Sequence, residues 1–106
     1  MATLKDLETE IRQMAKFYAE LSKSAEKNLD KDYAEMGQES GENILSLVEK
    51  YHSDPKNTYL KRIHSNLMTL TRGIEYFQDE DAQKKHDSYR PLVIKILRYV
   101  NENVKW

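Results

Sequence analysis

The chain has 106 residues, of which 39% are hydrophobic and 33% charged, and it contains no cysteine, three glycines and two prolines. This length predicts a single domain over residues 1–106, and the lack of cysteine excludes disulfides and thiolate metal sites. The small number of turn-forming residues argues against a β-sandwich or barrel, and no apolar run approaches the ~20 residues needed to span a bilayer.

Charge is distributed unevenly along the chain, although the net charge is only −1. Residues 1–53 carry 7 basic and 11 acidic side chains, a net −4, whereas residues 54–106 carry 10 basic and 7 acidic side chains, a net +3. Two interpretations fit this pattern: the halves attract each other within one bundle, or a basic C-terminal surface faces an acidic partner. The small total charge argues against a nucleic-acid-binding protein.

The first predicted helix begins at Thr3 and ends near Asn28. Its apolar residues recur at alternating spacings of three and four, which predicts an amphipathic helix with a heptad stripe. We expect Thr3 to cap this helix, with Asp6 completing a short capping box. The stripe consists of Leu4, Leu7, Ile11, Met14, Tyr18, Leu21 and Ala25.

The second predicted helix begins near Asp30, as its N-cap, and ends at "HSDPKN". Gly37 and Gly41 interrupt it, and each costs about 1 kcal/mol relative to alanine inside a helix. These glycines share one face, so either they let a neighbouring helix approach closely or the helix breaks at "MGQESG" and restarts with Ser40 as cap. We favour the continuous helix. Its apolar face consists of Tyr33, Met36, Ile44, Leu47, Val48 and Tyr51.

The third predicted helix has Asp54 as N-cap and Pro55 in its first turn. Its apolar stripe is the most regular in the chain, with spacings of three and four throughout. We therefore expect this stripe to form the centre of the core. It consists of Leu60, Ile63, Leu67, Leu70, Ile74 and Phe77.

The polar segment "QDEDAQKKHDSYRP", residues 78–91, is either a loop or a helical turn that leads into a fourth helix. Pro91 fits only a first turn, and it disfavours the helical conformation at Arg90. We therefore expect Asp87 or Ser88 to cap a fourth helix that ends near Asn103. The residues expected to face inward are Tyr89, Val93, Ile96 and Val100, helped by Leu92 and Leu97.

Four amphipathic helices joined by short connections pack antiparallel, and stripes with a period near 3.5 favour shallow crossings. The predicted fold class is therefore all-α, an antiparallel up-down-up-down four-helix bundle. A three-helix bundle with a broken second helix is the alternative.

His64 is the first candidate for chemistry, because it stands beside the core stripe of a predicted bundle, as phosphoacceptor histidines do. Histidine phosphotransfer domains resemble this chain in size and architecture, but they carry lysine and glycine where this chain has Leu67 and Met68. A sensor-kinase helix has an acidic residue directly after its histidine, where this chain has Ser65. We interpret His64 as a polar residue at the rim of the core, and phosphotransfer remains a minor alternative.

No other motif in the chain indicates an active site. His52 and His86 lie near predicted helix ends, and neither His64 nor His86 has a ligand four residues away. The segment "DEDAQKKHD" lacks the glycine and the alternating spacing of a calcium loop. Without a nucleophile motif, a phosphate-binding glycine loop or a dinucleotide fingerprint, we expect no catalytic residue, no metal, no cofactor and no enzymatic activity.

The C-terminal half combines tyrosine, tryptophan and arginine, which are enriched at binding hot spots. An alternative role for the tyrosines is to shield helix edges, and RNA binding by cations and aromatic rings is a minor option. We expect the following residues to contact a partner protein: Arg62, Arg72, Tyr76, Arg90, Lys95, Arg98, Tyr99 and Trp106.

Two segments, "IHSNLMTLTRGIEYF" and "RPLVIKILRYVNENVKW", together with the length and the helix layout, resemble the immunity proteins of class IIa (pediocin-like) bacteriocins. The resemblance covers nearly the whole chain. It implies a protein of Gram-positive bacteria that protects its producer from inside, at the cytoplasmic face of the mannose phosphotransferase permease once the bacteriocin has engaged it. In that family the C-terminal helix and tail, here residues 88–106, influence which bacteriocin is recognised.

The sequence therefore predicts a non-enzymatic protein-binding helical bundle, most specifically a bacteriocin-immunity-like protein. We expect it in the cytoplasm, because the polar N-terminal stretch "MATLKDLETE" has no hydrophobic signal region. It would be a monomer or a homodimer, since a heptad stripe can also seal a dimer. The alternative is a small inhibitor or adaptor of a host protein, encoded by a phage or mobile element.

Overall fold

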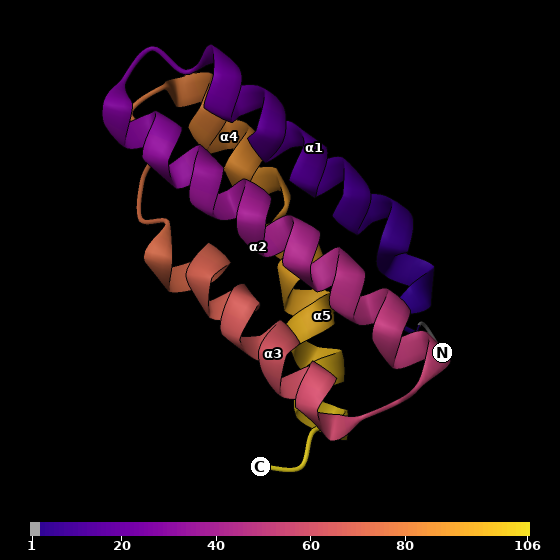
Figure 1. Cartoon of the computed structure of the whole chain (residues 1–106). Coiled ribbons are helices and arrows are strands. Elements are labelled where there is room, and N and C mark those ends of the chain that lie inside the picture. The colour runs from indigo at the N-terminus through magenta and orange to yellow at the C-terminus, as the bar shows by residue number, and fades with distance from the viewer. Residues whose placement is uncertain (1–2) are drawn as a thin grey trace.

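The computed structural model describes residues 3–106, which form five helices and two short helical turns (Figure 1). A 3₁₀ turn, Lys5–Leu7, precedes the first helix, and a π-helical turn, Thr69–Gly73, extends the third. The helices are α1 (Glu8–Ser24), α2 (Asn28–Ser53), α3 (Asn57–Met68), α4 (Glu80–Ser88) and α5 (Arg90–Asn103).

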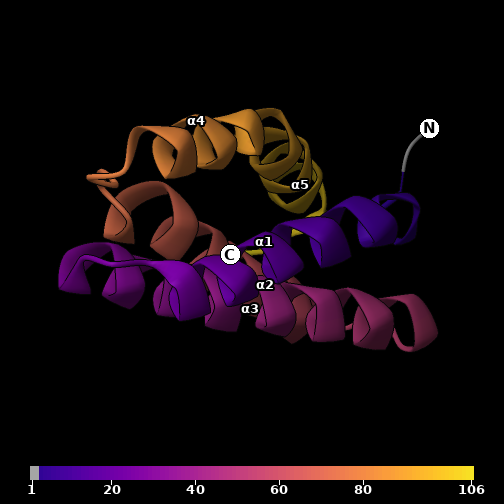
Figure 2. The same ribbon diagram turned by 90° about the horizontal axis from the view of Figure 1, so that it is seen from above.

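Helices α1, α2 and α3 run antiparallel in one layer, with α2 between the other two (Figure 1). Helices α4 and α5 follow each other around a bend and form a second layer across the first (Figure 2). Together α4 and α5 take the place of the predicted fourth helix. The four-helix arrangement is therefore confirmed, and its overall dimensions are 40 × 23 × 21 Å.

The start of α1 uses half of the predicted capping box. The backbone N–H of Thr3 donates to the Asp6 carboxylate at 2.9 Å, but no side chain caps the helix. The predicted heptad residues from Leu4 to Tyr18 are buried, whereas Leu21 and Ala25 are half-buried. The helix ends at Ser24 rather than near Asn28, because the backbone of Ala25 is extended.

Helix α2 is continuous through Gly37 and Gly41, as the sequence favoured. A Cβ atom at Gly37 would lie 2.6 Å from ring carbons of Tyr18, and one at Gly41 would lie 3.0 Å from the Cβ of Ala15. Both glycines therefore let α1 approach α2 closely. The predicted cap was wrong: α2 begins at Asn28, because the Asp30 side chain binds elsewhere, as described below.

Helix α3 begins at Asn57, three residues after the predicted cap Asp54. Asp54 instead lies 3.3 Å from the Lys56 ammonium, in an exposed turn. The predicted stripe of this segment is buried throughout, although its end is not α-helical: the backbone turns through Thr69–Gly73 and is extended at Ile74. The π-helical turn thus keeps the last apolar residues, up to Phe77, directed into the core.

The polar segment after Phe77 contains helix α4, so the predicted cap of the fourth helix at Asp87 or Ser88 was wrong. Asp79 caps α4 by accepting from the backbone N–H of Ala82 at 2.8 Å. Asp87 and Ser88 form the last turn of α4. The chain bends at Tyr89, and Pro91 lies in the first turn of α5 as expected.

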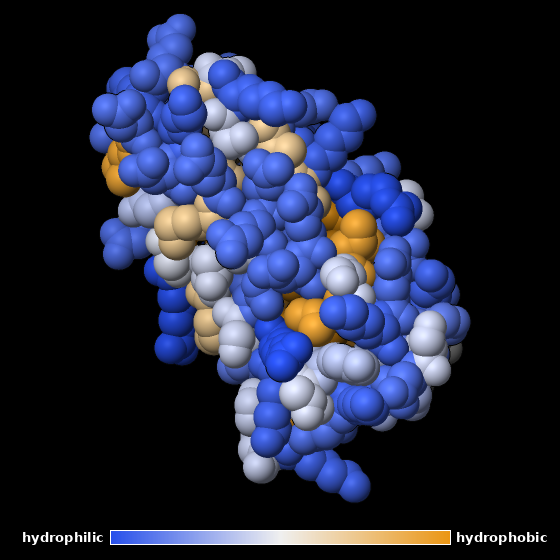
Figure 3. Space-filling model, viewed as in Figure 1, coloured by the Kyte–Doolittle hydropathy of each residue, from blue (hydrophilic) through white to orange (hydrophobic). Residues whose placement is uncertain are grey.

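Buried side chains from all five helices join in one hydrophobic cluster. The predicted inward residues of the fourth segment, Val93, Ile96 and Val100, belong to it, and Tyr89 packs against its edge. The opposite face of the first layer is predominantly hydrophilic (Figure 3). Within residues 3–106 no helix is long and apolar enough to cross a membrane.

Candidate functional site

Helix α5 presents a cationic outer face. Arg90, Ile94 and Arg98 follow at intervals of four and therefore form one row along the outside of the helix. Ile94 is 45% exposed, and the two arginines on either side of it are also exposed. Glu102, in the last turn, is the one acidic side chain of α5. An exposed apolar centre with arginine at its rim is typical of a protein-binding surface.

A groove of about 630 Å³ runs along one side of α5, between this helix and the N-terminal turn. Lys95, Arg98 and Tyr99 line one wall, and burial together with the neighbouring Tyr51 raises the pKa of the Tyr99 hydroxyl. The neutral hydroxyl can donate a hydrogen bond. The remaining lining residues are Thr3, Leu7, Glu102 and Asn103.

A much smaller slot, of about 70 Å³, lies on the other side of α5, where the π-helical turn meets the bend before the helix. It includes Tyr18 and His86, whose hydroxyl and Nδ1 atoms lie 2.5 Å apart. Burial lowers the pKa of His86 and raises the pKa of Tyr18 far above its usual range. Both side chains are therefore neutral near pH 7.

The structure brings only some of the predicted partner-binding residues together. Lys95, Arg98 and Tyr99 share the groove, and Arg90 borders the slot on the same helix. Arg62 lines a separate hollow between α2 and α3. The other three predicted residues lie in none of these places: Arg72 belongs to the π-helical turn, Tyr76 follows it, and Trp106 lies on the C-terminal tail.

Within residues 3–106, no ion pair involves a cation of the predicted set. Five ion pairs occur among the described residues, and each joins two residues of the same half of the chain. The attraction between an acidic and a basic half is therefore not realised as direct contacts. The charges of Arg90, Lys95 and Arg98 remain available to a partner.

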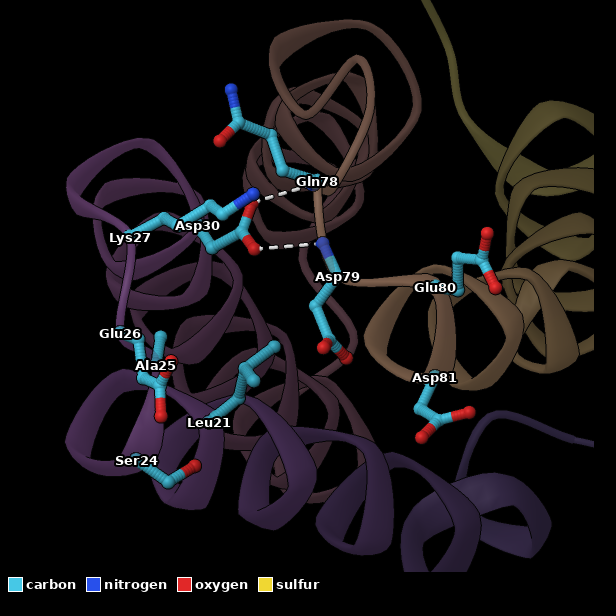
Figure 4. A pocket seen from close by; sticks show the side chains of 10 residues that line it. All are labelled: Leu21, Ser24, Ala25, Glu26, Lys27, Asp30, Gln78, Asp79, Glu80 and Asp81. Atoms are coloured by element: carbon cyan, nitrogen blue, oxygen red, sulfur yellow. Dashed lines mark hydrogen bonds between the residues drawn. The ribbon is translucent and has the colours of Figure 1, made fainter.

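A second hollow, of about 570 Å³, lies between the α1–α2 connection and the start of α4, and it is lined by several carboxylates (Figure 4). Two of these carboxylates already bind backbone. Asp30, only 2% exposed, accepts from the N–H groups of Gln78 and Asp79 at 2.7 and 3.0 Å, and Asp79 caps α4. Within residues 3–106 no group of three or more His, Cys, Asp or Glu side chains is placed to hold a metal ion.

His64 lies half-buried on α3, as expected for the rim of the core. Its ring packs edge-on against Trp106, with centroids 4.8 Å apart. The tail that carries Trp106 is fixed by Asn57, whose side chain both donates to the carbonyl of Lys105 and accepts from its N–H, each at 2.7 Å. The indole ring, 71% exposed, therefore covers one side of His64.

Sequence reasoning missed His86 and Asp30 as the polar residues with the most specific contacts. A signal for His86 is present, since Ala82, His86 and Tyr89 follow spacings of four and three on one face of α4. No local signal reveals Asp30, because its partners lie 48 and 49 residues away.

In comparisons with known proteins, no family model, curated protein or solved structure matches the chain.

Proposed function

We propose that this chain is a non-enzymatic protein-binding helical bundle that uses the outer surface of α5 and its groove to contact an acidic partner. The observation that carries this proposal is the row of unpaired cations around exposed Ile94, next to a groove lined by Lys95, Arg98 and Tyr99. Arginine and tyrosine at a concave, partly apolar surface can supply both specificity and much of the binding energy.

Most specifically, we propose a bacteriocin-immunity-like protein that acts in the cytoplasm, at the inner face of a membrane permease complex. The support for this finer proposal is the resemblance of residues 63–77 and 90–106, since the second of these segments contains α5 and the tail. The cationic surface and the region expected to set recognition in that family thus coincide.

The test is to express the chain in a lactic acid bacterium that is sensitive to pediocin-like bacteriocins and to measure survival. Protection against at least one peptide is expected, and an Arg90→Glu/Arg98→Glu variant should lose it. Lys31→Glu is the control for a charge reversal elsewhere, because Lys31 is an exposed cation on α2 and its reversal places an acidic residue near a helix N-terminus, where it is favourable. Unchanged killing by every peptide would remove the immunity proposal.

A pull-down from the lysate of the same host with the wild-type chain and the double variant separates immunity from other binding functions. A protein retained by wild type and Lys31→Glu, but lost with Arg90→Glu/Arg98→Glu, would support binding through α5 whatever the result of the killing assay. Equal retention by all three chains would contradict the use of this surface.

A further inference from the structure

The slot beside α5 is too small to be a site for a metabolite. Its volume of about 70 Å³ is well below the roughly 300–1,000 Å³ of small-molecule pockets. A space of this size fits part of a single side chain. Its lining is mainly apolar, and the apolar residues come from both sides of the slot: Leu70, Val93, Ile94 and Leu97.

One wall of the slot is the π-helical turn Thr69–Gly73, and this turn is held in place. The Thr71 hydroxyl donates to the carbonyl of Leu67 at 3.0 Å, and Leu70 is buried beneath it. Short π-helical segments occur frequently at functional sites. The wall is therefore preformed, so a ligand would not have to order it.

Tyr18 and His86 contribute aromatic rings to the lining of the slot. The Tyr18 hydroxyl and His86 Nδ1 bind each other, so neither atom needs a ligand as partner. The His86 ring also packs edge-on against Phe77, with centroids 5.2 Å apart. The slot therefore favours an apolar side chain over a polar one.

Arg90, the first residue of the cationic row described above, borders the slot, whereas Arg98 lines the groove on the other side of α5. Arg90 and Arg98 are eight residues apart on α5, a distance of about 12 Å along the helix axis. Ile94 lies midway between them and lines the slot. Arg90 is the only charged residue in the lining, so the electrostatic preference at the rim is for an anion.

We propose that the slot and the Arg90–Ile94–Arg98 row bind an acidic amphipathic helix of a partner protein. One apolar side chain of that helix enters the slot, and carboxylates one turn before and one turn after it contact Arg90 and Arg98. A helix matches because it presents side chains at intervals of four along one face, as α5 does. This inference rests on the proposed function and specifies the chemistry of the partner.

A rigid helix is preferred over an anionic lipid surface because the slot is concave and the two cations stand at a fixed spacing. A bilayer surface offers anions at no fixed spacing, and its attraction depends mainly on the number of nearby cations. The two kinds of partner are therefore distinguished by whether binding depends on spacing.

The experiment is a selection from displayed helical peptides of about 16 residues, long enough for four turns. The full chain, the Lys31→Glu control and Arg90→Glu/Arg98→Glu are immobilised separately, after circular dichroism confirms that each is folded. Wild type and control should enrich peptides with Asp or Glu four residues before and four residues after Leu, Ile or Met. The enriched peptides should bind the double variant at least about tenfold more weakly than wild type. The double variant should itself enrich peptides with Lys or Arg at the same positions.

The following results would overturn the inference. Enriched peptides that bind the double variant as well as wild type would show that the row is not the contact. Absence of an acidic pattern, combined with binding to vesicles containing phosphatidylglycerol that the double variant loses, would assign the surface to lipid. An acidic pattern without protection from bacteriocins would remove the immunity proposal and keep this inference. Protection without an acidic pattern would keep the immunity proposal and remove this inference.

Discussion

Tyr18 on α1 and His86 on α4 share a 2.5 Å hydrogen bond across 68 residues of sequence. Their rings also meet edge-on, with centroids 5.9 Å apart. Tyr18 is buried against Gly37 as well, so one side chain connects α1, α2 and α4. This contact fixes the position of the short helix that precedes α5.

Replacement of Tyr18 by phenylalanine should lower the free energy of unfolding by about 1–2 kcal/mol, because the ring remains but Nδ1 of the half-buried His86 loses its partner. Urea denaturation followed by circular dichroism measures the change. Tyr76→Phe is the matched control, since Tyr76 is 66% exposed, and it should change the stability by less than about 0.5 kcal/mol. Equal effects of the two substitutions would contradict the role of the hydrogen bond.

Stability should depend on pH through His86. Its pKa in the folded chain lies below the ordinary 6.5, so below about pH 6.5 the unfolded chain binds this proton more readily than the folded chain. The free energy of unfolding should therefore fall between about pH 7 and pH 5, and this contribution levels off once the pH drops below the folded pKa.

His86→Asn tests this dependence, because the asparagine amide can take the place of Nδ1 but does not titrate in this range. Urea denaturation at a series of pH values should give a smaller slope for the variant than for wild type. The other two histidines and the carboxylates are common to both chains, so the difference between the slopes isolates His86. Superimposable profiles would mean that His86 is not shielded from water.

Substitution of Asp30 by alanine should destabilise the chain by about 2 kcal/mol, because two backbone N–H groups lose a charged acceptor. Asp30→Asn keeps one acceptor oxygen and should cost about half as much. Hydrogen exchange provides the local readout: the amides of Gln78 and Asp79 should exchange faster in both variants. Asp32→Ala, at an exposed position of the same helix, should leave those amides unchanged.

Alanine should destabilise the chain at Gly37 but not at Gly73. At Gly37 the new methyl group would overlap the Tyr18 ring. We therefore expect the free energy of unfolding to fall by about 1–3 kcal/mol, despite the better helix propensity of alanine. At Gly73 the nearest atom is the flexible end of Met36, at 3.1 Å, and the substitution should be close to neutral. Thermal unfolding of both variants measures the two changes in stability. A stabilised Gly37→Ala variant would argue against close packing of α1 on α2.

The apolar periodicity of the sequence predicts most of the core and the helices α1, α2, α3 and α5, but not α4. All six residues of the Leu60–Phe77 stripe are buried, including the last two, which lie beyond the helix. Periodicity predicts burial here because the π-helical turn changes the backbone path without turning the apolar side chains outward. The bend at Tyr89 was partly predictable, since Pro91 requires a first helical turn.

The helix caps were harder to predict, because an acidic residue near a helix start can bind a distant backbone instead of its own helix. Asp30 illustrates this: its carboxylate binds the segment before α4, and α2 begins without a side-chain cap. The residues of the candidate surface were also hard to predict from sequence, because their grouping depends on the fold. Composition suggested eight contact residues, but only folding reveals that Lys95, Arg98 and Tyr99 share one groove while Trp106 packs on His64.

The α4–α5 segment is held at both ends by side chains that bind its backbone: Asp30 holds Gln78 and Asp79, and Asn57 holds Lys105. Such contacts do not depend on the side chain of the residue that is held. Both residues are exposed, so we expect positions 78 and 105 to tolerate substitution, except by proline, which lacks the N–H that is held. The ends of the segment tolerate sequence change while its position is preserved, so reactive probes could be introduced at both positions without displacing α5.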